Sequence, residues 1–272
     1  MRRLFAGGLA GRREPGRTLT ELLAIGSGVF VGFTLGLIGG GGSIVATPLL
    51  LYLVGMPPHV AIGTGALAVS ANAFVNFAGH ARAGNVRWAT AAIFASAGTV
   101  GALVGSTVGK AFDGHRLIFL FALMMIVVGI LMLRPRRGVG RAPAPITPWT
   151  AAKIVGIGLC VGLLSGFFGI GGGFLIVPGL ILATGMPMIN AIGTSLFAVG
   201  VFGLTTALNY AASGLVDWIV AAEFVVGGLV GGWLGLRTAC RLAAQRNTLT
   251  RMFAAVVFAV AAYIIWRSTG SA

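Results

Sequence analysis

Two glycine-rich clusters are the residues of this chain whose type and spacing could do chemistry. The first reads GLIGGGGSIVATP over residues 36–48, and the second reads GFFGIGGGFLIVP over residues 166–178. Each glycine destabilises a helix by about 1 kcal/mol relative to alanine, so three or four together favour unwinding. The clusters therefore predict a break in each of two helices.

The chemistry available at such a break is anion binding by backbone N–H groups. We expect a short helix to begin at Ser43 after the first cluster and at Gly173 after the second. The first N–H groups of a helix have no partner within it, and the helix dipole places about half a positive charge there. An anion stabilises this end without a basic side chain, and two breaks could clasp one anion between them. The candidate donors are Gly39, Gly41, Gly42, Ser43, Gly169, Gly171, Gly172 and Gly173.

Three polar side chains in apolar surroundings are further candidates for the anion site. Thr64 and Thr194 each end an Ala-Ile-Gly-Thr block, and either could donate to an oxyanion or to the carbonyl one turn back. Asn76, four residues after Asn72, could bind the substrate or bridge two helices. His80, near the end of the same apolar run, is expected to anchor that helix at the membrane interface.

Glu223 is an acidic residue well inside the predicted span Val216–Leu236. An ionisable group within a membrane is costly, which makes a functional role the default hypothesis. Glu223 could couple transport to protons, or it could pair with an arginine near the interface.

The elements that position these residues follow from the composition. Of the 272 residues, 57% are hydrophobic and only 9% are charged, and the mean hydropathy is +0.98. A soluble domain carries roughly 25% charged residues, and a disordered chain is poor in apolar ones, so both classes are excluded. The net charge of +14 comes from arginine clusters that flank apolar runs, a pattern typical of membrane proteins and not of nucleic-acid binding. The class is an all-α polytopic membrane protein.

Eight apolar runs are candidates to cross a membrane, for which about 17–25 residues are needed. They are Leu19–Ile38, Val60–Gly79, Trp88–Gly109, Leu117–Leu133, Ile154–Ile170, Ile189–Ala212, Val216–Leu236 and Met252–Trp266. Two shorter runs, Ile44–Val54 and Phe174–Thr184, read as half-helices that follow the glycine breaks. We expect eight crossings, and the alternative is that the half-helices complete crossings of their own.

An offset of 130 residues relates the two halves of the chain without a gap. It carries Gly39 to Gly169 and Thr64 to Thr194, and it matches the Gly-Met-Pro turns at 55–57 and 185–187. We therefore expect two tandem homologous repeats, which in transporters enclose the substrate site. The expected segments are a basic, cytoplasmic N-terminal part (1–18), a first repeat (19–133), an Arg/Pro-rich linker (134–149), a second repeat (150–267) and a tail (268–272).

The doubled G-x-x-G-x-G-G-G…P pattern, with an Ala-Ile-Gly-Thr block after each Gly-Met-Pro turn, resembles the sulfite exporter TauE/SafE family. The resemblance covers roughly residues 20–266. It implies a multi-pass protein of the bacterial inner membrane that transports small, mostly sulfur-containing anions such as sulfite and sulfonates. Ser43 stands where the second half has Gly173, a departure that leaves the break intact but makes the two ends unequal.

These features together predict a permease that moves a small anion by alternating access. Its expected partners are the anion, the lipid bilayer and, if transport is coupled, protons or another ion; the sequence is compatible with a homo-oligomer. No residue set has catalytic or metal-ligand spacing, so we expect neither enzymatic activity nor a cofactor or metal. The alternatives are a permease for another organic acid, an amino acid or a halide, a passive anion channel, and a scaffold or assembly factor that transports nothing.

Overall fold

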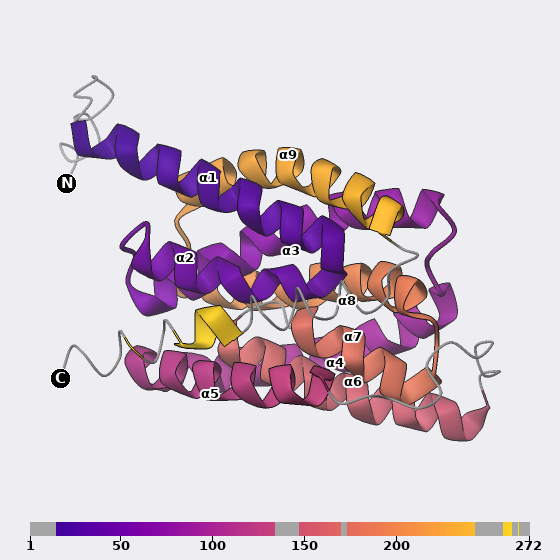
Figure 1. Cartoon of the computed structure of the whole chain (residues 1–272). Coiled ribbons are helices and arrows are strands. Elements are labelled where there is room, and N and C mark those ends of the chain that lie inside the picture. The colour runs from indigo at the N-terminus through magenta and orange to yellow at the C-terminus, as the bar shows by residue number, and fades with distance from the viewer. Residues whose placement is uncertain (1–14, 134–146, 170–172, 243–257, 263–265, 267–272) are drawn as a thin grey trace, which may run out of the picture.

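The computed structural model describes residues 15–133, 147–169, 173–242, 258–262 and 266, and every regular element within these ranges is helical (Figure 1). The elements are α1 (Pro15–Ile38), the 3₁₀ helix η1 (Gly39–Val45), α2 (Ala46–Tyr52), α3 (Pro58–Arg82), α4 (Trp88–Ala111), α5 (Gly114–Leu133), α6 (Pro148–Phe168), α7 (Gly173–Thr184), α8 (Met188–Ala211) and α9 (Trp218–Leu242).

Six of the described helices are long and apolar enough to cross a membrane: α1, α3, α4, α6, α8 and α9. They coincide with six of the eight predicted spans, which confirms the prediction of an all-α polytopic membrane protein. The predicted span Leu117–Leu133 lies in the 20-residue helix α5, which is not among these six. The predicted span Met252–Trp266 lies mostly outside the described residues, although residues 258–262 and 266 are helical.

Helix α1 is described from Pro15, which lies inside the expected N-terminal segment. Helix α6 begins with a proline, Pro148, inside the expected linker. Proline suits a first helical position because its φ is already helical and its missing N–H would have no partner there. Thr147 also caps α6, accepting a hydrogen bond from the N–H of Thr150 at 3.3 Å. The rest of the linker and the tail lie outside the described residues.

Residues with positive φ recur at the 130-residue offset. Each of the six such residues in the described chain is a glycine that ends or links helices. They form the pairs Gly39 and Gly169, Gly55 and Gly185, and Gly84 and Gly214, with φ between 66° and 81°. The turns that redirect the chain are therefore alike in the two halves.

Three helices form a first bundle: α1, α3 and α9. Gly28 of α1 lies against Phe224 of α9, and Gly36 lies against Gly232. Asn76 of α3 also contacts Gly232. Residue numbers rise together along these contacts, so the three helices run in the same direction. Figure 1 shows α1 and α9 side by side along one edge of the molecule.

A second bundle consists of α4, α6 and α8. Gly162 and Gly166 of α6 lie against Gly98 and Ala102 of α4. Further along α4, Ser106 accepts a hydrogen bond from the Asn209 amide of α8 at 2.7 Å. These three helices are also parallel to one another. Each bundle therefore holds two helices from one half of the sequence and one from the other.

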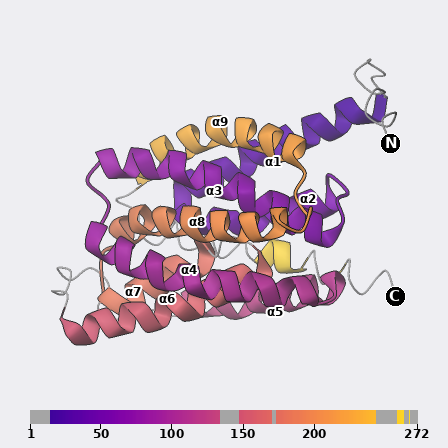
Figure 2. The same cartoon turned by 180° about the vertical axis from the view of Figure 1, so that it is seen from behind.

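Helices α3 and α8 join the two bundles at the centre of the molecule (Figure 2). The Ser70 hydroxyl donates to the carbonyl of Gly200 at 2.6 Å, and the rings of Phe74 and Phe197 lie 6.5 Å apart. Residue numbers rise on one helix as they fall on the other, so α3 and α8 are antiparallel. Among the six long helices these two are the most buried, with 67% and 72% of their apolar stretches inside the molecule.

Glycines spaced four residues apart on one helix face predict close helix contact, and the structure confirms this. Gly28, Gly32 and Gly36 face the backbone of α9, and Gly101, Gly105 and Gly109 face the backbone of α6. A Cβ atom at Gly32 would lie 2.6 Å from the Cα atom of Gly228. Small residues let membrane helices approach this closely, which provides dispersion contact where no hydrophobic effect acts.

Candidate functional site

The first glycine cluster forms a 3₁₀ helix in place of the predicted unwound stretch. Gly39 has φ of +73° and ends α1, and residues 39–45 continue as η1. Helix α2 then begins at Ala46, three residues after the predicted start at Ser43. The tighter 3₁₀ turn still redirects the chain, and glycines follow it because they lack a Cβ atom. Gly41, Gly42 and Ser43 lie inside η1, and Ser43 is fully buried.

The second cluster breaks its helix as predicted. Helix α6 ends at Phe168, and Gly169 follows in the left-handed conformation with φ of 66°. Its N–H bonds to the carbonyls of Ser165 and Gly166, which is the usual way a glycine closes a helix C-terminus. Helix α7 then begins at Gly173, the predicted residue. The candidates Gly171 and Gly172 lie outside the described residues.

Each break packs against the Ala-Ile-Gly-Thr block of the other half. A Cβ atom at Gly39 would lie 3.2 Å from the Cα atom of Ile192, and one at Gly169 would lie 3.1 Å from the Cβ atom of Ile62. Ile62 and Ile192 are themselves 130 residues apart. The two breaks therefore have the same kind of neighbour, supplied reciprocally.

The hydroxyls of Thr64 and Thr194 are engaged with the backbone of the opposite half. Thr64 Oγ1 accepts a hydrogen bond from the N–H of Asp217 at 2.9 Å, and Thr194 Oγ1 accepts one from the N–H of Arg87 at 3.1 Å. Both partners immediately precede a long helix, α9 or α4. The threonines thus fix where α9 and α4 begin. Each threonine still has its hydroxyl proton to donate to another acceptor.

The two breaks lie at opposite ends of the central helix pair. Ser70 and Gly200 meet where α3 and α8 cross, and Ile62 and Ile192 are each eight residues from that point. At a rise of about 1.5 Å per residue, the breaks are separated by about 24 Å along the helices. Gly39 and Thr194 are therefore at one end and Gly169 and Thr64 at the other. Between these ends η1, which contains Gly41, Gly42 and Ser43, packs against α7, which begins at Gly173.

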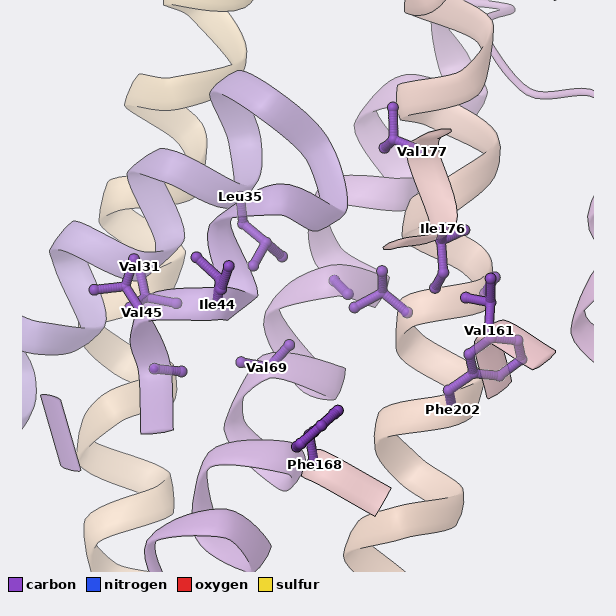
Figure 3. Close-up of a cluster of buried hydrophobic side chains, with 14 of the residues drawn as sticks. Val31, Leu35, Ile44, Val45, Val69, Val161, Phe168, Ile176, Val177 and Phe202 are labelled. Carbon is purple, nitrogen blue, oxygen red and sulfur yellow. The ribbon is translucent and has the colours of Figure 1, made fainter. Parts of the chain in front are cut away.

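Apolar side chains occupy the region between the ends. Figure 3 shows Leu35 of α1, Ile44 of η1, Val69 of α3, Ile176 of α7 and Phe202 of α8 in this buried cluster. All five side chains are at most 1% exposed. Thr64, Asn76 and Thr194 lie beside the breaks, whereas Ser43 directly precedes Ile44 of this cluster.

Beside the first break, α3 carries a stripe of polar residues at intervals of four: Asn72, Asn76 and His80, which we call the amide–imidazole stripe. All three are at most 4% exposed. The Asn76 amide donates to the carbonyl of Asn72 at 2.9 Å, and a Cβ atom at Gly36, just before the break, would lie 3.1 Å from Asn76 Oδ1. His80 is fully buried beside the backbone of Gly36, which corrects the expectation of an interfacial anchor.

The second break has hydroxyl groups at the equivalent positions. Thr206 and Tyr210 of α8 follow Asn76 and His80 by 130 residues, and both are fully buried. Ser165 lies four residues before Gly169 and is 1% exposed. None of these three hydroxyls has a hydrogen-bond partner among the described residues. We call Ser165, Thr206 and Tyr210 the hydroxyl group.

Sequence reasoning missed a polar network that joins α4 to α8. Lys110 Nζ donates to the carbonyl and the side-chain oxygen of Asn209, at 3.0 and 2.9 Å, and to Ser213 Oγ at 2.9 Å. The Asn209 amide in turn donates to Ser106 and Thr107. A lysine in the last turn of an apolar span was the available signal, since such a cation needs oxygen partners.

Glu223 is the sixth residue of α9 and is partly buried. It follows the Asp217 turn and precedes Phe224, which contacts Gly28 of α1. Glu223 is therefore close to one end of the first bundle. In the sequence it is far from the glycines of both breaks.

Comparison with known proteins agrees with this architecture. A family model described as "Sulfite exporter TauE/SafE" matches residues 24–264. A probable membrane transporter protein of Xylella fastidiosa (strain 9a5c) is 56% identical over 257 residues, covering 92% of this chain and 97% of the relative. The probable membrane transporter protein YunE of Bacillus subtilis (strain 168) is 29% identical over 261 residues, covering 88% and 95%. No solved structure matches. With a family model matched over nearly its whole length and six helices of membrane-spanning length, this chain belongs to the TauE/SafE sulfite exporter family of membrane transporters.

Proposed function

We propose that this protein is a permease for a small anion, with sulfite, a sulfonate or a related organosulfur anion as its substrate. The anion is held by backbone N–H groups at the glycine breaks, together with polar side chains of α3 and α8. The proposal extends the family assignment to a substrate class and a mechanism, with the cell inner membrane as the location.

The observation that carries the proposal is the reciprocal packing of the breaks. Gly39 lies against Ile192 and Gly169 against Ile62, each break thus meeting the opposite half. A movement of one bundle against the other must change both contacts, because α3 and α8 belong to different bundles. Opening at one end while the other stays closed is the motion that alternating access requires.

The helix directions support an inverted relation between the halves. Helix α3 is antiparallel to its counterpart α8, as expected for repeats related by a two-fold axis in the membrane plane. Because α1 and α3 are parallel, the segment between them, η1 and α2, must return across the bundle. We infer five membrane segments in each half, ten in all, in place of the eight expected from span length. The arginine clusters at 134–141 and 237–251 then share one side of the membrane.

Proton coupling through Glu223 is a further part of the proposal. Import of an anion against an inside-negative potential costs about 2.3 kcal/mol per charge at 100 mV, so import needs a coupled cation. Glu223 supplies an exchangeable proton near one end of α9. Export of a monovalent anion would need no such partner.

Counterflow in proteoliposomes tests the proposed function. Liposomes loaded with one unlabelled anion are diluted into labelled sulfite, with sulfite, sulfate, sulfoacetate, taurine, acetate and chloride as the panel. Saturable uptake driven by sulfite or a sulfonate is expected, and the Gly41→Leu and Gly171→Leu variants should lose it. Flux without counterflow would identify a channel. Folded protein that supports neither would contradict transport of these anions and favour a scaffold.

A further inference from the structure

We propose that the amide–imidazole stripe beside the first break is the principal oxyanion-binding subsite, and that the hydroxyl group beside the second break is not. This inference rests on the proposed function and assigns Asn72 and His80, together with Asn76, to the substrate. The ligand class is a small oxyanion, such as sulfite or the head of a sulfonate.

Unused hydrogen-bonding capacity in the stripe is the first argument. Asn72 is 1% exposed, yet neither atom of its side-chain amide has a partner among the described residues, and His80 is fully buried beside the backbone of Gly36. More than nine in ten buried polar groups in native proteins are paired, so the unpaired amide on this helix face needs an explanation. A ligand that accepts hydrogen bonds from the Asn72 NH₂ group during transport provides one.

The position of the stripe is the second argument. Asn72 lies two residues past the α3–α8 crossing at Ser70, and His80 lies ten residues past it, about 15 Å along the helix. The stripe therefore runs from the middle of the molecule to the end at which the first break lies. The Asn76 amide lies against both α1 and α9. A Cβ atom at Gly36 of α1 would lie 3.1 Å from its side-chain oxygen, and one at Gly232 of α9 would lie 2.6 Å from its side-chain nitrogen.

The contrast with the second half is the third argument. Phe202 occupies the position equivalent to Asn72, and its ring stacks on Phe94 with centroids 6.0 Å apart. Thr206 and Tyr210 replace the amide and the imidazole. An amide NH₂ offers two N–H donors and an imidazole one or two, whereas each hydroxyl has a single proton. The first half is thus the better oxyanion donor, and the substrate should distinguish the two.

Paired variants test this assignment in the full-length protein. Asn72→Leu and His80→Phe replace each hydrogen-bond donor by an apolar side chain of comparable bulk. His80→Gln removes the imidazole but restores an N–H donor. The matched controls are Thr206→Val and Tyr210→Phe, which remove the orphan hydroxyls of the second half. Each protein is assayed for the KM of sulfite counterflow and for the rise in Tm that sulfite produces in detergent.

We expect Asn72→Leu and His80→Phe to raise KM by about tenfold or more, the effect of losing a hydrogen bond to a charged ligand. Without sulfite, the Tm of Asn72→Leu should stay at or above the wild-type value, because an unpaired polar group has been replaced, and in both variants the sulfite-dependent rise should disappear. His80→Gln and both controls should keep the rise. Variants that retain wild-type KM and Tm response, or controls that lose them equally, would overturn the assignment. If the wild type shows no counterflow with any anion of the panel, the proposed function itself fails.

Discussion

Replacing Gly32 with alanine should weaken the first bundle, whereas the same change at Gly26 should not. Both glycines lie on α1, but a Cβ atom at Gly26 has nothing within 4 Å. One at Gly32 would lie 2.6 Å from the Cα and 2.7 Å from the carbonyl carbon of Gly228. The carbonyl oxygen of Gly228 would lie closer still, and ordinary contact begins at 3.4 Å, so α1 and α9 must separate by roughly 0.8 Å or more.

The pair of variants isolates the energy of that separation. Alanine favours a helix over glycine by about 1 kcal/mol, and both variants gain this equally. Overpacking of a tight interface costs about 1–3 kcal/mol, and only Gly32→Ala incurs it. At about 2–4 °C per kcal/mol for a chain of this size, Gly32→Ala should melt several degrees below Gly26→Ala.

Thermal unfolding of the purified protein in detergent, followed by tryptophan fluorescence, measures this difference. Gly162→Ala should behave like Gly32→Ala, because Gly162 meets Gly98 in the second bundle as Gly32 meets Gly228 in the first. Equal Tm values for Gly32→Ala and Gly26→Ala would refute the close approach of α1 to α9.

Three further predictions concern hydrogen bonds and charge. Thr64→Val and Thr194→Val should each lower the unfolding free energy by about 1–2 kcal/mol, measured by denaturant titration, because each leaves a backbone N–H unpaired. The double variant should be additive, and a coupling well above about 0.5 kcal/mol would contradict their placement at opposite ends. Lys110→Met should lower Tm because it removes the three hydrogen bonds that Lys110 donates to Asn209 and Ser213. The control Lys153→Met, at the exposed start of α6, should leave Tm unchanged. A similar fall in Tm for both variants would speak against the network. Glu223→Gln should abolish the pH dependence of net anion transport while leaving counterflow intact, and an unchanged pH profile would remove Glu223 from coupling.

Local features of the fold were predictable from the sequence because they depend on neighbouring residues. Six of the eight predicted apolar runs coincide with helices of membrane-spanning length, and glycine spacing predicted which helix faces would touch. The break at Gly169 and the start of α7 at Gly173 also followed from local backbone preferences. The first cluster differed because four glycines with a following Ser43 tolerate a continuous 3₁₀ turn.

Partners distant in the sequence were not predictable. The backbone N–H that donates to the Thr64 hydroxyl belongs to a residue 153 positions further along the sequence. The oxygens that accept hydrogen bonds from Lys110 are about 100 positions away in the sequence. The duplication shows which positions are alike, but it does not show that α4 and α9 exchange places between the bundles. That exchange, together with the antiparallel pairing of α3 and α8, places Gly39 and Gly169 at opposite ends of the central helix pair, while η1 still packs against α7.

Side-specific labelling of cysteines is the most direct test of the inverted arrangement on which the transport mechanism depends. Ala83 and Ala212 are exposed residues in the equivalent α3–α4 and α8–α9 turns. In a background that lacks Cys160 and Cys240, Ala83→Cys and Ala212→Cys are treated in intact cells with a membrane-impermeant maleimide, before and after permeabilisation. Inverted halves predict that one cysteine reacts in intact cells and the other only after permeabilisation. Reaction of both from the same side would contradict the arrangement.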